Sequence, residues 1–168
     1  MTQPYRLSQI NRFSQSEFVE ALGAVFEGTP AIAAQAWQQR PFASIEDLHQ
    51  AMVQSMAQLS DQEALGLMCA HPDLGSRLHM APASVQEQAR AGLDQLTPQE
   101  YQQFLQLNQS YRQRFGFPFI MAIKGQSKQA IQAAFHRRLG HSPAQEKEQA
   151  LREVAKIARF RLTALVQP

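Results

Sequence analysis

Helix-start signals recur along this chain, and they limit its possible folds more than any other feature. At intervals a serine or threonine precedes a segment whose apolar residues have helical spacing, in most cases with Glu, Asp or Gln three positions later. Such a side chain accepts a hydrogen bond from a backbone N–H of the first turn, while the acid or amide bonds back to the cap. Helices are therefore predicted to begin at Ser14, Thr29, Ser44, Ser60, Ser84, Thr97, Ser127 and Ser142.

The apolar residues of these segments predict which helix faces are buried. In the first predicted helix they recur through Phe18, Leu22 and Phe26, and this helix is expected to end at Gly28. The last helix is predicted to be the longest and to run to about Val166. A stripe on the helix after Ser44 is predicted to face a core, and it consists of Ile45, Leu48, Met52, Met56 and Leu59.

One segment, residues 115–123, has no helical pattern. Its aromatic and β-branched residues favour an extended conformation, but no second strand is predicted to pair with it, and Pro118 lacks an N–H donor. The segment is expected to lie buried between helices, where its backbone polar groups need partners and a polar ligand could be one. The predicted fold is all-α: a single domain over residues 1–168, built as a bundle of about eight helices with one short non-helical aromatic segment.

Composition and charge exclude several classes of protein. The net charge of +2 comes from 16 basic and 14 acidic residues that are interleaved, which does not support nucleic-acid binding. No window approaches the ~18 apolar residues of a membrane-spanning helix, and no signal peptide is expected in residues 1–13. The protein is accordingly expected to be cytoplasmic. The single Cys69 cannot form an intramolecular disulfide and is predicted to be buried.

His71 stands directly before Pro72, and a proline ring pushes the residue before it out of the helical conformation. His71 is therefore predicted to lie just past a helix end, whereas Glu87 lies in the first turn of the helix predicted at Ser84. Polar groups at two helix ends can converge on a small ligand. Simpler interpretations remain open, with His71 as a helix cap or surface residue and Ser84 and Glu87 as an ordinary capping box.

Arg161 falls within the apolar arc of the last helix, between Val154 and Ile157. Because an isolated buried charge is very costly, this arginine must be paired. A structural salt bridge satisfies that condition, and so does an anion clamp, since the guanidinium fork matches a carboxylate. The pattern leaves both roles open.

Other kinds of chemical site have little support in the sequence. Cys69, His71, Asp73 and His79 have no recognised metal-ligand spacing, so no metal site is predicted. A Ser-His-Asp hydrolase is also unsupported, because the chain has neither a Gly-x-Ser-x-Gly motif nor a strand to carry it.

A set of short motifs occurs in a definite order along the chain. It consists of Phe26-Glu27-x-x-Pro30, Arg40-Pro41-Phe42, His71-Pro72-Asp73-Leu74, Ser84-x-x-Glu87-Gln88, Phe115-Gly116-Phe117-Pro118-Phe119 and Glu153-Val154-x-Lys156-Ile157-x-x-x-Arg161. Each motif alone is weak, but in this order they resemble the OHCU decarboxylase family over nearly the whole chain. Those enzymes act on 2-oxo-4-hydroxy-4-carboxy-5-ureidoimidazoline (OHCU) in the conversion of urate to allantoin.

The resemblance implies an all-helical homodimer that acts on a small-molecule substrate without a cofactor. His71 and Glu87 would be the catalytic pair, with Glu87 kept ionised by the helix dipole and orienting His71. Arg161 would hold an anionic or carbonyl oxygen of the substrate. The other substrate-binding residues that the resemblance implies are Pro72, Ser84, Gln88, Phe117, Phe119, Ile120 and Met121, the last four through backbone groups near the substrate ring.

Two alternatives stay open at this point. A non-enzymatic helical interaction module would expose Met52, Met56 and Met68 as an adaptable partner surface. A lyase for a related ureide would use the same pocket on a different substrate.

Overall fold

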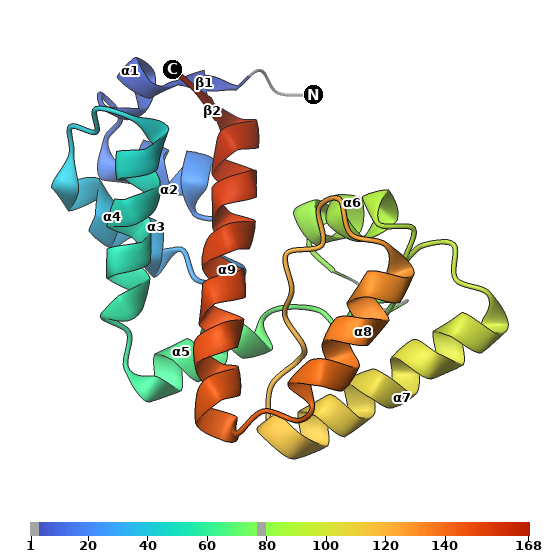
Figure 1. Ribbon diagram of the computed structural model, residues 1–168. Helices are drawn as coiled ribbons and strands as arrows, with labels where there is room; N and C mark the ends of the chain where they lie inside the picture. The colour runs from blue at the N-terminus through green and yellow to red at the C-terminus, as the bar shows by residue number, and fades with distance from the viewer. Residues whose placement is uncertain (1–3, 77–79) are drawn as a thin grey trace. The chain divides into compact units, whose positions relative to one another are not determined.

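A computed structural model describes residues 4–76 and 80–168 (Figure 1). Within these residues the chain forms nine α-helices, one short 3-10 helix and a two-stranded parallel sheet, so the all-α prediction is confirmed. In chain order the elements are β1 Tyr5–Arg6, α1 Leu7–Ile10, α2 Gln15–Leu22, α3 Ala31–Ala36, η1 Trp37–Gln39, α4 Ile45–Ala57, α5 Asp61–Cys69, α6 Pro82–Arg90, α7 Pro98–Phe115, α8 Lys128–Arg138, α9 Pro143–Leu165 and β2 Val166–Gln167.

Backbone contacts divide the chain into two compact units. The first unit comprises residues 1–67 and 155–168, and the second comprises residues 68–154. Both units take part of α9. The expectation of a single domain over residues 1–168 stays a prediction.

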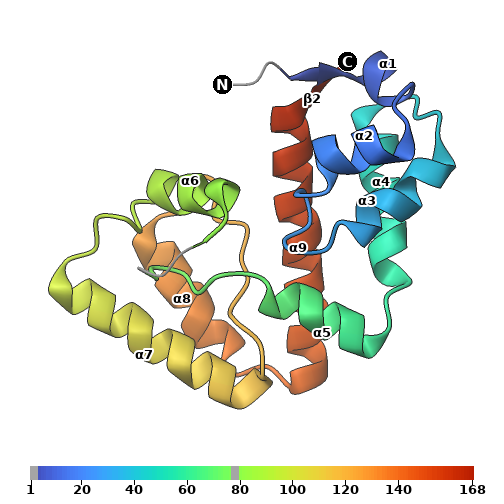
Figure 2. The same cartoon turned by 180° about the vertical axis from the view of Figure 1, so that it is seen from behind.

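The first unit is built around α3, which packs against both α2 and α4. Its core contains side chains that are fully buried, among them Phe18, Ile32, Leu48 and Met52. The parallel pair of β1 and β2 joins the two ends of the described chain, with Tyr5 opposite Val166, as both views show (Figures 1 and 2). This pair is too short for any sequence pattern to predict.

The second unit contains α7 and α8, which lie side by side in both views (Figures 1 and 2). Its core is aromatic. The rings of Phe119 and Phe135 stack with centroids 3.7 Å apart, and Tyr111 meets both rings edge-on. Residues 116–123 form neither helix nor strand, and Phe117, Phe119 and Ile120 are buried. The prediction of a buried, non-helical aromatic segment is therefore confirmed.

Most predicted helix starts are confirmed by their hydrogen bonds. Ser44 and Ser127 accept a bond from the backbone N–H three residues on. Four further caps also donate their own backbone N–H to the acid or amide side chain three residues on, and these reciprocal boxes are at Ser14, Ser60, Thr97 and Ser142. The predicted cap at Thr29 is wrong, because α3 begins at Ala31 with Pro30 as its N-cap.

The predicted end of the first helix at Gly28 is wrong, because α2 ends at Leu22. The chain turns there and places Val25 and Phe26 in the core from a non-helical segment. This turn frees the carbonyl groups of Ala24 and Val25 from helical bonding, and the Nη1 atom of Arg161 lies 3.5 and 3.4 Å from them. A long-range contact has overridden the local periodicity.

Burial confirms that Leu48, Met52 and Met56 face a core, but it contradicts the alternative of a methionine partner surface and the predicted burial of Cys69. Met52, Met56 and Met68 are 0%, 8% and 1% exposed, so the methionine surface that an interaction module would need does not exist. Cys69 is exposed at the end of α5, with its Sγ atom 3.8 Å from the carbonyl oxygen of Gly116. Leu67 and Met68, which precede it, are the buried side chains at this end of the helix.

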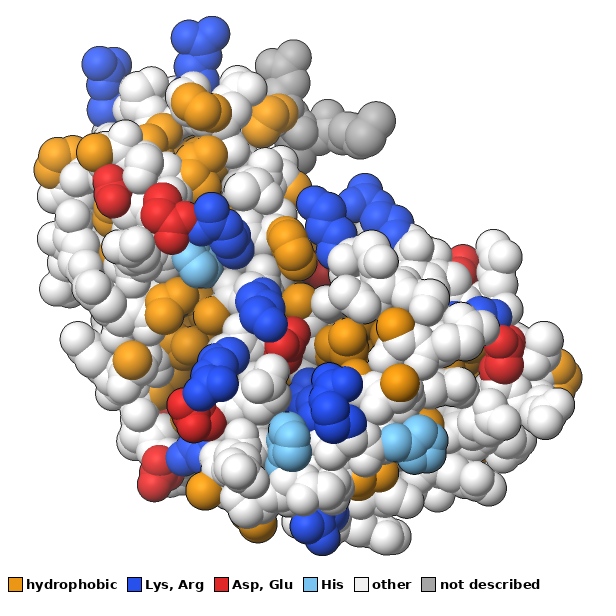
Figure 3. Space-filling view, in the orientation of Figure 1, with side chains coloured by type: hydrophobic (Ala, Val, Ile, Leu, Met, Phe, Trp, Pro, Cys, Tyr) orange, Lys and Arg blue, Asp and Glu red, His pale blue; other side chains and the backbone are white. Residues whose placement is uncertain are grey.

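Charged side chains are interspersed along α9 on the face that Figure 3 shows. Arg152 pairs with Glu148 one turn away, and Arg159 pairs with Glu46 of α4. In the part of the chain that the structure describes, no helix is both long enough and apolar enough to cross a membrane.

Candidate active site

His71 lies directly after α5, as predicted, and begins an irregular segment. Its backbone N–H still bonds to the carbonyl of Met68 at 3.2 Å, which closes the last turn. The residue is only 6% exposed, so it is neither a surface histidine nor a freely solvated one. A buried imidazole at a helix end is compatible with a chemical role.

The predicted capping box at Ser84 is wrong. The helix begins two residues earlier, with Pro82 at its first position and Ala81 as the N-cap. Proline favours that position because its fixed φ suits a helix and its missing N–H is not needed there. Glu87 therefore lies in the second turn of α6 and not in the first. The helix dipole falls off within one turn, so the predicted placement of Glu87 next to it does not hold.

Ser84 and Gln88 lie one turn apart on the buried face of α6, with Glu87 half-buried beside them. The side-chain amide of Gln88 bonds to the segment that follows His71. Its Oε1 accepts from the N–H of Gly75 at 2.8 Å, and its Nε2 donates to the carbonyl of Asp73 at 3.3 Å. Gln88 thus ties α6 to the segment that carries His71.

Helix α7 holds the same segment from another side. The Nδ2 atom of Asn108 donates to the carbonyl of Leu74 at 2.8 Å, and the Nε atom of Arg112 donates to Asp73 Oδ1 at 2.9 Å. Gly75 has φ of +74°, in the left-handed region that favours glycine. Residues 73–75 are accordingly fixed by side chains from both α6 and α7.

The predicted ring-binding segment is held by a buried ion pair. The Nη1 atom of Arg138 donates to the carbonyl of Ile120 at 2.7 Å, and its Nε donates to Glu146 Oε1 at 2.7 Å. Tyr111 and His141 also bond to Glu146. Burial, and then the hydrogen bond to Glu146, raises the pKa of the Tyr111 hydroxyl above its usual value.

Arg161 belongs to the first unit and is 7% exposed there. Its Nη1 atom lies 2.8 Å from Oε2 of Glu27, which is buried to the same extent. The prediction that this arginine must be paired is confirmed, and the partner is a carboxylate of the protein.

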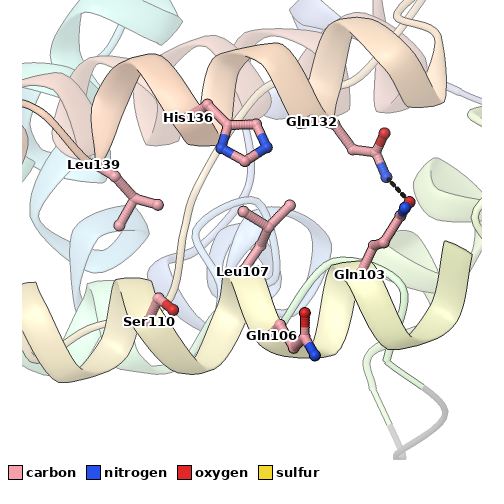
Figure 4. A pocket seen from close by; sticks show the side chains of 7 residues that line it. All are labelled: Gln103, Gln106, Leu107, Ser110, Gln132, His136 and Leu139. Atoms are coloured by element: carbon pink, nitrogen blue, oxygen red, sulfur yellow. Dashed lines mark hydrogen bonds between the residues drawn. The ribbon is translucent and has the colours of Figure 1, made fainter.

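A groove of about 460 Å³ lies between α7 and α8 (Figure 4). Five of its seven lining residues have polar side chains, and the lining consists of Gln103, Gln106, Leu107, Ser110, Gln132, His136 and Leu139. Gln132 bonds to Gln103 across it at 3.1 Å. None of the predicted site residues lines this groove.

No group of three or more His, Cys, Asp or Glu within residues 4–76 and 80–168 is arranged to hold a metal ion. His79, one of the residues weighed as a metal ligand, lies outside the described residues.

The fold and these buried polar groups define a helical protein with a candidate site for a small polar ligand. The OHCU decarboxylase family matches residues 11–163. The chain is 46% identical over 156 residues to the 2-oxo-4-hydroxy-4-carboxy-5-ureidoimidazoline decarboxylase of Haloferax volcanii, covering 93% of each chain. It is 45% identical over 162 residues to the enzyme of the same name from Halalkalicoccus jeotgali, covering 96% of this chain and 92% of that one.

A solved structure described as (S)-allantoin synthase has the same fold. It superposes with a TM-score of 0.79 at 29% identity, over 96% of this chain and 54% of the longer one. The chain belongs to the OHCU decarboxylase family.

The motif search missed Arg138, Glu146 and Asn108. A signal for Arg138 exists, because it stands seven residues after Ile131 and three after Phe135 on the buried face of α8. Like Arg161, Arg138 is a charged residue at an apolar position of a helix and must be paired. Glu146 and Asn108 have no such signal, because glutamate and asparagine are common on exposed helix faces.

Proposed function

We propose that this protein decarboxylates OHCU to (S)-allantoin in urate degradation, without a cofactor. The observation that carries the proposal is the family match over residues 11–163 together with two relatives of that name at 45% and 46% identity. The matched stretches cover 92% and 93% of those relatives.

The substrate's own bonding makes the reaction possible. The bond from C4 to the carboxylate breaks, its electron pair forms C4=C5, and the C5=N imine accepts the displaced pair and a proton. The resulting enol carries the hydroxyl on C4. Protonation at C5 and loss of the hydroxyl proton then give the ring carbonyl of allantoin. The protein supplies orientation, stabilisation of charge and delivery of a proton to one face.

His71 and Glu87 form the catalytic pair in this proposal. His71 acts on the C4 hydroxyl or the departing carboxylate and shuttles the proton, and Glu87 orients its imidazole. The burial of His71 at 6% exposure supports this role, because a water-excluded imidazole transfers protons more selectively than a solvated one. Glu87 is half-buried in the second turn of α6, next to Gln88, whose amide bonds to the segment that follows His71.

The substrate-binding residues are Pro72, Ser84, Gln88, Phe117, Phe119, Ile120, Met121 and Arg161. Gln88 has spare capacity for this role, since its amide carries a second N–H and a second lone pair beyond the bonds to Asp73 and Gly75. Arg161, which pairs with Glu27, carries a guanidinium fork whose geometry suits an anionic or carbonyl oxygen. A homodimer and a cytoplasmic location complete the proposal.

Freshly generated OHCU tests this function directly. The protein is expected to accelerate the loss of substrate absorbance and to yield (S)-allantoin in enantiomeric excess, read by circular dichroism. His71→Asn should reduce the rate to near the spontaneous one. If wild-type protein leaves both rate and stereochemistry unchanged, the function is wrong. If Glu87→Gln keeps normal turnover while His71→Asn loses it, the paired mechanism is wrong.

A further inference from the structure

The peptide groups on either side of Met121 are each held by one buried charged side chain. The carbonyl of Ile120 accepts from Arg138 Nη1 at 2.7 Å, and the N–H of Ala122 donates to Glu153 Oε2 at 2.8 Å. Arg138 is 3% exposed and Glu153 is 6% exposed. Both contacts are therefore shielded from water, and each fixes the plane of one peptide group.

These two contacts also determine where the remaining polar groups point. Both peptide bonds are trans, and in a trans peptide the C=O and N–H point in opposite directions. The N–H of Met121 therefore points away from Arg138, and the C=O of Met121 points away from Glu153. Within the described residues neither Met121 group has a hydrogen-bond partner. The half-buried Met121 thus offers one hydrogen-bond donor, its N–H, and one acceptor, its C=O.

Arg138 is held rigidly enough to act as such a support. Its guanidinium lies over the ring of Phe119 at 4.4 Å and donates through Nε to Glu146, which is fully buried. Glu146 is fixed in turn by Tyr111 and by His141 Nδ1 at 2.8 Å. A buried ion pair rarely contributes net stability over an apolar replacement, and the fixed geometry of this pair suits a positioning role.

We propose that Arg138 and Glu153 are positioning residues that aim the N–H and C=O of Met121 at the substrate. The group recognised is an amide or ureide edge, which offers one carbonyl oxygen and one N–H of its own. This inference rests on the proposed function, because it assumes that the segment faces a ureide-bearing ring. Arg138 and Glu153 themselves do not contact the substrate.

Two conservative substitutions separate positioning from mere stability. Arg138→Lys keeps the positive charge beside Glu146, but a single ammonium cannot reach both Glu146 and the Ile120 carbonyl as the fork does. Glu153→Gln keeps an oxygen that accepts from the Ala122 N–H, whereas Glu153→Ala loses it. The exposed pair of Arg152 and Glu148, which lies on α9 as Glu153 does, provides the controls Arg152→Lys and Glu148→Ala.

The measurements are steady-state kinetics with OHCU and the amide NMR signal of Met121 during titration with (S)-allantoin. Arg138→Lys and Glu153→Ala are expected to raise KM roughly 5- to 10-fold, the loss of about one aligned hydrogen bond, with a smaller change in kcat. Glu153→Gln should restore the wild-type KM. The Met121 amide signal should shift with (S)-allantoin in wild type, and should shift less at the same concentration in Arg138→Lys, because Arg138 holds the peptide that contains the Met121 N–H.

Unchanged KM in folded Glu153→Ala and Arg138→Lys overturns the inference, and so does a Glu153→Gln variant as impaired as Glu153→Ala. If Arg138→Lys does not fold, the Glu153 pair decides the question by itself. Wild-type protein that neither turns over OHCU nor binds (S)-allantoin overturns the proposed function instead, so the two failures are distinguishable.

Discussion

Two arginines lie on buried helix faces, and each has a carboxylate partner within its own unit. Arg161 pairs with Glu27 in the first unit, and Arg138 pairs with Glu146 in the second. Removing one member of such a pair leaves an uncompensated charge in a medium that solvates it poorly. Removing one partner is therefore expected to destabilise the fold by more than the intact pair stabilises it.

Glu27→Ala should lower the free energy of unfolding by about 3–5 kcal/mol, because it leaves the buried Arg161 guanidinium without its carboxylate. Urea denaturation measures the change. Glu148→Ala is the control, since Glu148 forms an exposed pair for which a loss of less than about 1 kcal/mol is expected. Equal losses in the two variants would show that Glu27 is not the essential partner.

Tyr111 makes stability depend on pH in the alkaline range. Its hydroxyl is buried against Glu146, which raises its pKa in the folded protein, whereas in the unfolded chain it ionises near pH 10. Above about pH 10 the folded state thus binds more protons than the unfolded state, and the free energy of unfolding falls by up to about 1.4 kcal/mol per pH unit. Below that pH the contribution is fully present.

Tyr111→Phe should remove this component of the slope. Urea denaturation at a series of pH values from about 9 to about 11 measures it, with Tyr101→Phe on the same helix as the control. An identical slope in wild type and Tyr111→Phe would contradict the argument.

At the scale of single elements, local chemistry decides where most helices begin. Thr97 and Glu100 form a reciprocal box at the start of α7, and Gly116 ends that helix in the left-handed conformation. Helix α6 is the exception, because a proline at its first position replaces the cap expected at Ser84. The early end of α2 has a different cause, since the turn after Leu22 provides carbonyl groups for Arg161.

The same glycine-to-alanine substitution should have opposite effects at two helix positions. Gly66 lies exposed within α5, so Gly66→Ala should raise the free energy of unfolding by about 0.5–1 kcal/mol. Gly116 has φ of +80°, so Gly116→Ala should lower it by about 1–2 kcal/mol. No atom within 4 Å obstructs a Cβ at either position, so steric clash does not confuse the comparison. Changes of the same sign, measured by thermal denaturation, would refute the backbone argument.

At the scale of the whole molecule, the proposed homodimer needs an apolar surface. Phe160 on α9 is 38% exposed and lies off the apolar arc of its helix, and Leu105 on α7 is exposed to the same extent. Phe160 is our candidate contact, because it is an exposed aromatic side chain off the apolar arc of the last helix.

Phe160→Lys should therefore weaken self-association, because it places a charge in an apolar contact. Sedimentation equilibrium is expected to give a dimer for wild type and a dissociation constant at least ~10-fold higher for the variant. Leu105→Lys is the matched control and should leave the dimer unchanged. A monomeric wild type would refute the homodimer, and an unaffected Phe160→Lys variant would place the interface elsewhere.

Much of the candidate site could be predicted from the sequence, but its internal connections could not. The end of a helix before His71, the burial of Arg161 and the non-helical run through Phe117 and Ile120 all follow from local rules about proline, helical period and β-branched residues. The partner of Arg161 does not follow from such rules, because Glu27 belongs to a distant part of the chain and any of 14 acidic residues could have met the need. The hydrogen bond from Arg138 to the Ile120 carbonyl could not be predicted for the same reason.

The sequence by itself determined that this chain is helical, where most helices begin, and that one arginine of the last helix is buried and paired. These properties depend on residues within about one helical turn of each other, so local hydrogen bonding and helical periodicity are enough to predict them. Only the tertiary structure decided that α2 ends at Leu22, that Gln88 ties α6 to residues 73–75, and that Arg138 and Glu153 hold the peptides around Met121. These features depend on contacts between residues that are far apart in the chain, and such contacts form only when the core packs.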